Sequence, residues 1–162
     1  MAQGAVDMFL KLDGVTGETL DTAMSGAMDI VNWSWGLQND GNFHMAGGGG
    51  VGKAAVNDIT VTKNIDAASA TLMQMCVTGQ HVATGTLTCR KSGGTPLDYL
   101  VIKLSKILVS SYSTQGTGSL QHQENFSLHF AEVNVQYNSQ NDQGGKKAPA
   151  VMKWKVPANT KG

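Results

Sequence analysis

Residues 28–53, MDIVNWSWGLQNDGNFHMAGGGGVGK, join an aromatic segment to a glycine run, and this stretch decides the expected fold. In residues 29–35 the side chains alternate with the period of a β-strand. The alternation places Val31, Trp33 and Trp35 on one face. Asn32 and Ser34 lie with Ile30 on the other face. We therefore expect both indole rings to enter one hydrophobic core and Ser34 to point away from it.

Residues 36–52 show no periodicity, and five of the six residues from 47 to 52 are glycine. Such a composition predicts a long, mobile, extended loop, and loops of this length in a compact domain are commonly functional. Residues 54–64 alternate again and predict the next strand, so the loop is expected to be a flexible hairpin-like arm.

Two phosphate-binding patterns fall in this loop. Gly47, Gly52 and Lys53 fit G-x-x-x-x-G-K, and the glycines also fit G-x-G-x-x-G. Both patterns require a helix after the loop, and the first requires Ser or Thr where Ala54 stands. Since a strand is expected there, we predict no nucleotide cofactor.

Length and composition limit the number of domains and the kinds of binding partner that we expect. With 162 residues the chain is expected to form one domain, residues 1–162. Only 15% of the residues are charged and the formal net charge is zero, against a usual charged share of about 25%. A surface of this kind resists association poorly, which favours assembly with other protein, although ordinary β-sandwiches also carry few charges.

Other partners are disfavoured. Arg90 is the one arginine and no basic stripe is present, so nucleic acid is not expected. Asp7 and Lys11 interrupt the apolar start, and no later stretch approaches the roughly 20 apolar residues of a membrane span. We expect neither a signal peptide nor membrane insertion, so synthesis is cytoplasmic and export needs a dedicated machine.

The sequence contains no recognisable group of metal-binding or catalytic residues. Cys76 and Cys89 are expected to be two reduced thiols, and the four histidines lack the spacing of a zinc site, so no metal is predicted. His44 and His81 are conceivable acid–base residues, but neither a nucleophile motif nor paired carboxylates accompany them. We predict that the protein is not an enzyme.

The rest of the chain reads mainly as strands. Alternation predicts strands at 6–12, 82–91, 97–113, 124–137 and 150–156, with a loop at 16–27. The two longest strands are expected to pair through TQGTGS at 114–119, with bulges at 105–106 and 131–132. Residues 65–79 predict one helix, begun by Asp66 and ended by Gly79, with Ile65 on its apolar side.

The predicted fold is therefore mainly β: a small antiparallel β-barrel or two packed sheets, one α-helix and a long extended loop. Strand edges guarded by few charges favour edge-to-edge closure between subunits. The expected core includes Trp33, Trp35, Leu72, Cys76, Phe126 and Phe130.

An ordered set of motifs runs nearly the length of the chain. These are WSWG at 33–36, HMAGGGG at 44–50, GK at 52–53, TK at 62–63, DAASATLMQMC at 66–76, RKSGG at 90–94, YLVIKL at 99–104, LVSSYS at 108–113 and ENFSLHFAEVNVQY at 124–137. Together they resemble the haemolysin co-regulated protein family. The sequence departs from the family at 16–27, 114–119 and 138–149, which bears on partner choice.

The resemblance implies a secreted subunit of the type VI secretion inner tube, assembled as hexameric rings that stack into a hollow tube. Its implied partners are further copies of the chain, the spike, the sheath and the effectors carried in the ring. The resemblance also implies that the long loop reaches the adjacent ring. The residues expected to make that contact are Asn42, His44, Met45, Gly47, Gly48, Gly49 and Gly50.

Within a ring, Asn32 and Ser34 would face the lumen and contact effectors, or else lie on an exterior or subunit contact, because alternation fixes only the face. The alternative from another class is a monomeric extracellular binding module, a lectin-like or adhesin-like sandwich. It would expose the same strands and polar surface but carry a secretion signal and stay monomeric.

Overall fold

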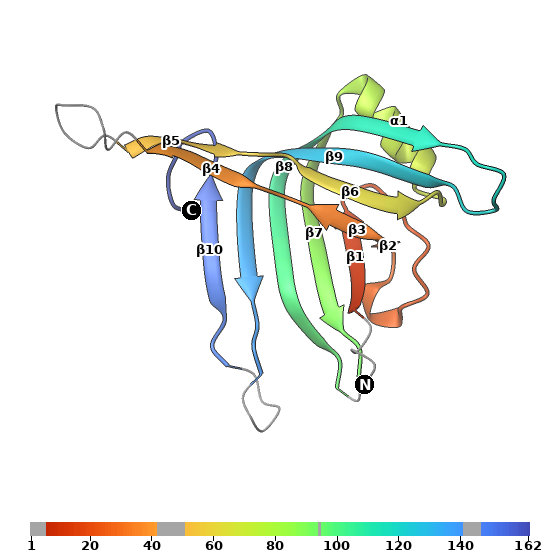
Figure 1. Cartoon of the computed structure of the whole chain (residues 1–162), viewed down its shortest axis with the longest axis horizontal. Helices are drawn as coiled ribbons and strands as arrows, with labels where there is room; N and C mark the ends of the chain where they lie inside the picture. Colours follow the sequence, from red (N-terminus) through yellow and green to blue (C-terminus); the bar gives the residue numbers. More distant parts are fainter. Residues whose placement is uncertain (1–5, 42–50, 94, 141–146) are drawn as a thin grey trace.

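A computed structural model describes residues 6–41, 51–93, 95–140 and 147–162 of the chain. The described residues are mainly β, with one α-helix and one 3₁₀ turn, which confirms the predicted fold class (Figure 1). The elements are β1 (Val6–Leu12), η1 (Thr22–Met24), β2 (Met28–Asp29), β3 (Asn32–Ser34), β4 (Leu37–Gly41), β5 (Val51–Val56), β6 (Ile59–Asn64), α1 (Ser69–Thr78), β7 (His81–Lys91), β8 (Leu97–Gln115), β9 (Gln123–Tyr137) and β10 (Ala150–Lys155).

The main sheet is antiparallel and curled into a half-barrel, with strand order β2-β1-β7-β8-β9-β6-β3. β8 and β9 pair along their length as the predicted hairpin and bend together (Figure 1). β9 then serves two neighbours, because its first half pairs with β6 and its last half pairs with β10. The bend of these two strands lets one sheet turn back over its own apolar face.

Apolar side chains stand in register across five strands on one face of the main sheet. Every second residue of β1, β7, β8, β9 and β10 is apolar or small on the same face. The rows are Leu10–Leu87–Ile102–Val135–Met152 and Leu12–Gly85–Leu104–Val133–Trp154, with Met8–Cys89–Leu100–Tyr137–Ala150 beside them. The opposite face of these strands is mostly polar, so a shift of one residue in any strand would expose its apolar set.

Residues 29–35 do not form the single predicted strand. The Ile30 amide donates to the Met8 carbonyl and the Val31 amide donates to the Thr62 carbonyl, each at 2.9 Å, so the chain crosses from the β1 edge to the β6 edge. The crossing ends the alternation: Ile30 is buried, whereas Val31 is 43% exposed. The predicted faces of Ile30 and Val31 were therefore wrong.

The stretch predicted as a long hairpin-like loop contributes β4 and the start of β5 to a second, two-stranded antiparallel sheet. This ribbon projects beyond the curled sheet (Figure 1). The predicted strand at 54–64 is also divided, because β5 ends at Val56 and β6 begins at Ile59. The Asn57 amide donates to the Gly36 carbonyl at 3.1 Å, which fixes the ribbon where it leaves the body.

The helix α1 begins at Ser69, later than the predicted start. Leu72 and Met75 are buried, whereas Ile65 lies before the helix and is 45% exposed. Asp66 still contributes, because its Oδ1 accepts from the Ala68 amide at 2.9 Å. Gly79 ends the helix in the left-handed conformation at φ 66°, as predicted.

The predicted change of phase in β8 occurs at residues 105–106, since Leu104 and Ile107 are both buried although three residues apart. Lys106, between them, has a positive φ of 55°. The register of β8 against β9 shifts further along, between Val109 and Ser111. In β9 the predicted change of phase occurs, since Phe130 and Val133 are both buried although three residues apart.

Candidate assembly surfaces

A polar face without charged side chains covers β3, β6, the first half of β9 and the last third of β8. Its members stand in two cross-strand rows, Ser34–Thr60–Ser127–Ser111 and Asn32–Thr62–Asn125–Ser113. Thr62 Oγ1 donates to Asn125 Oδ1 at 2.5 Å, and the Thr60 and Ser127 hydroxyls lie 3.4 Å apart. The face is therefore a partly preformed layer of hydroxyl and amide groups that can both donate and accept hydrogen bonds.

Asn32 and Ser34 lie on this polar face and are exposed, whereas Trp33 between them packs against the core. The structure thus places the two residues expected at a lumen side by side on one neutral surface. The sequence could have identified their partners as well, because Thr60 and Thr62 alternate with Ile59 and Val61 in the same way.

Charges on the same strands point to the interior. Lys63 Nζ lies 2.5 Å from Glu124 Oε1 and 2.6 Å from Asp66 Oδ1, and Lys63 and Glu124 are fully buried. Ser69 Oγ donates to Glu124 at 2.9 Å and the Tyr112 hydroxyl also donates to Glu124. This network ties the start of α1 to β6, β8 and β9, and it leaves the outer face neutral.

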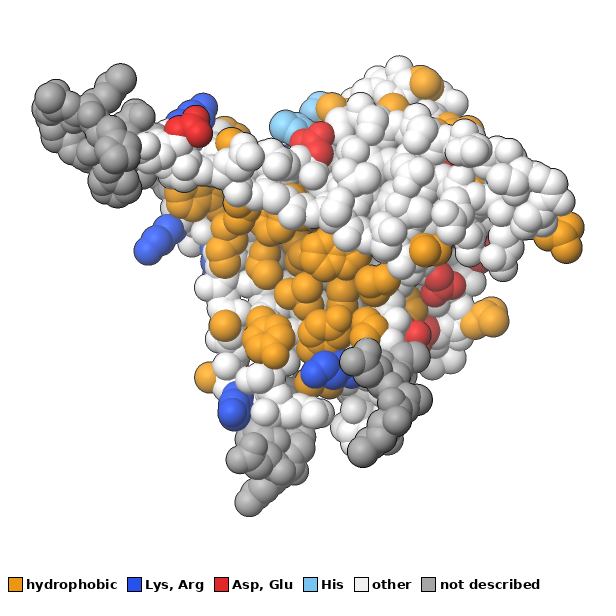
Figure 2. Space-filling model, viewed as in Figure 1, with side chains coloured by type: hydrophobic (Ala, Val, Ile, Leu, Met, Phe, Trp, Pro, Cys, Tyr) orange, Lys and Arg blue, Asp and Glu red, His pale blue; other side chains and the backbone are white. Residues whose placement is uncertain are grey.

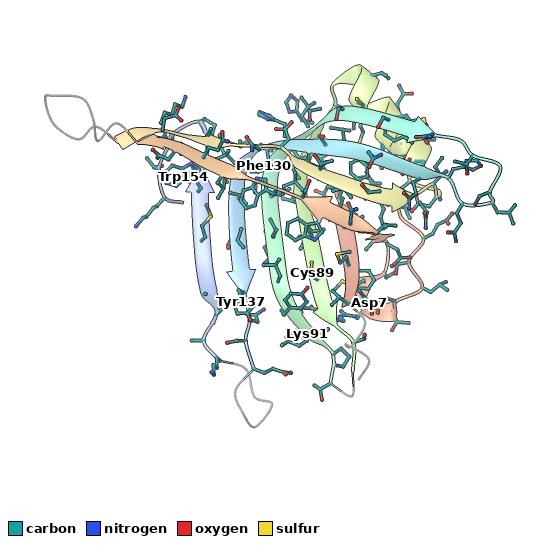
Figure 3. The ribbon with its side chains drawn as sticks, viewed as in Figure 1. Asp7, Cys89, Lys91, Phe130, Tyr137 and Trp154 are labelled. Atoms are coloured by element: carbon teal, nitrogen blue, oxygen red, sulfur yellow. The ribbon has the colours of Figure 1, made fainter. Side chains whose placement is uncertain are left out.

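A second surface is apolar and only partly covered. The apolar rows of the main sheet are buried at β1 and β7, but they continue across β9 and β10, where Val133 is 3% and Tyr137 46% exposed. Met152 and Trp154 of β10 are half-buried. Figure 2 shows hydrophobic side chains spread below the ribbon across this face, and Figure 3 locates Trp154 and Tyr137 on its two outer strands.

The apolar face extends beneath the β4–β5 ribbon. A hollow of about 340 Å³ lies between the ribbon and β10. Its walls are Leu37, Gln38, Asn39, Ala54, Ala55, Val56, Met152 and Trp154. Contiguous exposed apolar surface of this kind is typical of interaction sites. Sequence reasoning identified the strand that carries Met152 and Trp154 but not that its apolar side is left uncovered.

The expected core residues divide into two groups. Leu72, Phe126 and Phe130 are buried, with at most 3% of each exposed. Trp33, Trp35 and Cys76 are only partly buried, although all three pack against the core. Trp35 Nε1 donates to the Asn57 carbonyl at 2.9 Å, and its ring meets the Phe130 ring edge to face at 6.1 Å. The indoles thus lie at the border between the covered core and the uncovered apolar face.

Cys89 is buried at this border, where burial raises the pKa of its thiol despite hydrogen bonds with Trp33 and Tyr99. Both cysteines are free thiols. Lys91 Nζ lies 5.4 Å from the centre of the Tyr99 ring. Figure 3 shows Cys89 and Lys91 on β7, a strand that carries part of the apolar face.

Three side chains of types used in catalysis meet at one edge of the polar face. Ser110 Oγ donates to Asp58 Oδ2 at 2.6 Å, and His129 Nδ1 lies 2.7 Å from Asp58 Oδ1. The carboxylate stands between the hydroxyl and the imidazole, so His129 is not placed to take a proton from Ser110. This arrangement fixes the two side chains and does not define a general base.

The remaining sequence predictions concern two histidines, the inter-ring residues, metal binding and membrane spans. His81 is exposed at the start of β7, whereas His44 lies outside the described residues. The other expected inter-ring residues also lie outside the described residues: Asn42, Met45, Gly47, Gly48, Gly49 and Gly50. Within the described part of the chain, no three His, Cys, Asp or Glu side chains are grouped to hold a metal ion. Among those same residues, no helix has the length and apolarity of a membrane span.

Comparison with known proteins identifies this arrangement. The sequence profile of the family described as "Type VI secretion system effector, Hcp" matches residues 9–137. The protein hcp1 of Pseudomonas aeruginosa is 42% identical over 158 residues, covering 96% of this chain and 98% of the relative.

Solved structures agree with the sequence comparison. A structure described as a type six secretion system protein has a TM-score of 0.90 at 30% identity and covers 98% of this chain and 100% of its own. Hcp1 from Salmonella typhimurium has a TM-score of 0.80 at 28% identity, covering 97% and 99%. The fold and sequence are those of a type VI secretion protein. The chain belongs to the haemolysin co-regulated protein (Hcp) family.

Proposed function

We propose that this chain is the structural subunit of a type VI secretion inner tube, closing with copies of itself into six-membered rings that stack. The observation that carries the proposal is the apolar face that continues past the covered core over β9 and β10. A single chain leaves Met152, Trp154 and Tyr137 partly in water, and a neighbouring subunit would bury them.

The neutral polar face would line the bore of the ring. Hydroxyl and amide groups offer hydrogen bonds to a carried protein, while the absence of charge avoids strong attraction or repulsion that would depend on the client. Asn32 and Ser34 stand at the β3 side of this face, and we assign them to contact with small effectors. The lumen role of the whole face rests on ring closure.

The ribbon of β4 and β5 would bridge between rings. It projects from the body. In the sequence its two strands flank the residues expected to reach the adjacent ring, which are Asn42, His44, Met45, Gly47, Gly48, Gly49 and Gly50. The role is mechanical, without chemistry: a contracting sheath would drive the stacked tube, tipped by a spike, from the cytoplasm to the exterior. Ring closure is the stronger contact in this proposal and stacking is the weaker one.

Sedimentation combined with negative-stain microscopy tests the proposal. We expect a species of about six times the 17.1 kDa chain mass and six-fold rings with a central hole. A compact single chain at every concentration would instead favour the alternative of a monomeric extracellular binding module. Deletion of residues 47–50 should preserve the rings and abolish stacking, and normal tubes from that variant would overturn the assignment of the ribbon.

A further inference from the structure

A further groove lies beside the edge of the polar face at which His129 stands. It has a volume of about 700 Å³ and lies where the β7, β8 and β9 strands bend. Its lining residues are Lys53, His81, Val82, Ala83, Lys106, His129, Phe130, Ala131, Val156 and Pro157. No carboxylate is among them, so its charged rim is entirely of the cationic type.

Strand register explains why the groove is hollow. His81 and His129 both stand opposite Leu108 and form one row across three strands, which places their backbones about 10 Å apart. Ala83 and Ala131 line the groove together with Lys106, and their small side chains leave a depression. The Val156 amide donates to the Ala131 carbonyl at 2.8 Å, which brings Val156 and Pro157 to the wall.

Lys106 occupies the centre of the groove in a backbone conformation that disfavours it. Its φ of 55° lies in the left-handed region, which costs a residue with a Cβ about 1 kcal/mol or more and which glycine would adopt freely. The Lys106 side chain is exposed. Within the described part of the chain, none of the side-chain hydrogen bonds or ion pairs given above involves it, so none offsets this cost. Strained residues of this kind concentrate at binding sites.

The charges around the groove have one predominant sign. Asp58 is the nearest acid by contact, and it is already bonded to His129 and Ser110. Across the next row of the sheet lies a smaller hollow that carries Lys103, Lys153 and Lys155 with one acid, Glu132. A neutral chain therefore presents a locally basic region, and the complementary partner is acidic.

We propose that this groove binds an acidic segment of a partner protein, with carboxylates at Lys53 and Lys106 and an apolar side chain on the alanine, valine and proline floor. The apolar floor favours a peptide over nucleic acid. A nucleic-acid site needs a row of cations that follows the phosphates and exposed aromatic rings on which the bases stack. The groove is complete within one chain, so the proposal does not rest on ring formation.

Fluorescence anisotropy with a fluorescein-labelled Leu-Glu-Glu-Leu-Glu-Glu-Leu peptide tests the proposal on the full-length protein. The glutamine version of the peptide and a labelled thymidine oligonucleotide are the comparison probes. We expect saturable binding of the acidic peptide that weakens with salt, and weaker binding of both other probes. Equal binding of the glutamine peptide, or tighter binding of the oligonucleotide, would overturn the assignment.

Lys106→Gly is the decisive variant, because glycine removes the cation and also relieves the backbone strain. We expect about tenfold weaker peptide binding, the value of one charge-assisted contact, with no loss of thermal stability. Lys103→Ser removes the same charge from the same strand outside the groove and should change the affinity by less than about twofold. Unchanged affinity in Lys106→Gly, or an equal loss in Lys103→Ser, would refute the site.

Discussion

Lys63 Nζ and Glu124 Oε1 lie 2.5 Å apart on neighbouring strands, and neither side chain is exposed to solvent. Asp66 shares the ammonium, while Ser69 and Tyr112 donate to the carboxylate. Each buried charge thus has partners that satisfy it, which is the condition for a buried ion pair to be tolerated. The pair connects the start of the helix to the strands of the polar face.

Lys63→Met should therefore destabilise the fold strongly, by about 3–5 kcal/mol, because it leaves Glu124 buried and charged without its cation. The double variant Lys63→Met with Glu124→Gln should recover most of this loss, since the neutral amide leaves no buried charge, its oxygen can accept from Ser69 and its NH2 can donate to the Tyr112 oxygen. Urea unfolding of both variants measures the difference. A double variant no more stable than Lys63→Met would contradict the explanation.

Tyr112 should make the fold sensitive to alkaline pH. Burial, and then its bond to Glu124, raise the pKa of the Tyr112 phenol above its ordinary value. A group whose pKa is raised on folding contributes stability that is complete below its unfolded pKa, about 10 for tyrosine, and that is lost as the pH rises above it. Thermal unfolding at stepped pH should show stability falling faster above about pH 10 in the wild type than in Tyr112→Phe. Parallel slopes would show that Tyr112 does not titrate in this way.

Arg90 should fasten the segment before β2 to the outside of the sheet. Its Nε lies 2.8 Å from Asp98 Oδ1 and its Nη1 lies 3.0 Å from Asp21 Oδ2, while the guanidinium carbon is 5.4 Å from the Phe9 ring centre. Lysine cannot span both carboxylates in this geometry. Arg90→Lys should therefore cost about 1–2 kcal/mol in urea unfolding.

The neighbouring exchange Lys91→Arg is the matched control for Arg90→Lys. Lys91 contacts the Tyr99 ring, and arginine would keep a cation there. We expect a change within about 0.5 kcal/mol. Equal losses from the two exchanges would mean that the bridging of Asp21 and Asp98 by Arg90 contributes nothing specific.

Much of the fold follows from alternation in the sequence. The long strands β8 and β9, their hairpin and the left-handed Gly79 were predicted because their side chains are apolar on one face or because glycine permits the conformation. The same rule contained a signal for the buried ion pair, since Lys63 continues the face of Ile59 and Val61. Lysine is rarely buried, so its place on the apolar face did not by itself predict an interior ion pair.

Other features depend on contacts that alternation does not encode. Ile30 is buried because the chain crosses between two sheet edges, and this crossing depends on the distant strands β1 and β6. The residues of β4 are all exposed and do not alternate between apolar and polar side chains, so periodicity did not predict the strand β4 itself. The half-burial of Trp33 and Trp35 depends on where the covering strands end, which pattern analysis cannot locate.

Subunit association should depend on the apolar side of β10. Met152→Glu places a carboxylate on the face that the proposed ring buries, and should weaken association by at least about a hundredfold. Val151→Glu introduces the same charge at the adjacent residue, which is 51% exposed on the opposite face. Sedimentation velocity should show single chains for Met152→Glu and rings for Val151→Glu. The reverse result would place the interface on the other side of the strand.

Client retention should depend on the neutral polar face. Ser34→Gln enlarges a side chain beside Asn32 and Thr60 without adding charge, so the ring should form while the space and hydrogen bonds for a carried protein change. We expect about tenfold weaker retention of small effector proteins, measured by native mass spectrometry of purified rings. Val151→Gln, on the outer face of β10, is the control and should retain clients normally. Rings of Ser34→Gln that hold effectors as the wild type does would place Ser34 outside the bore.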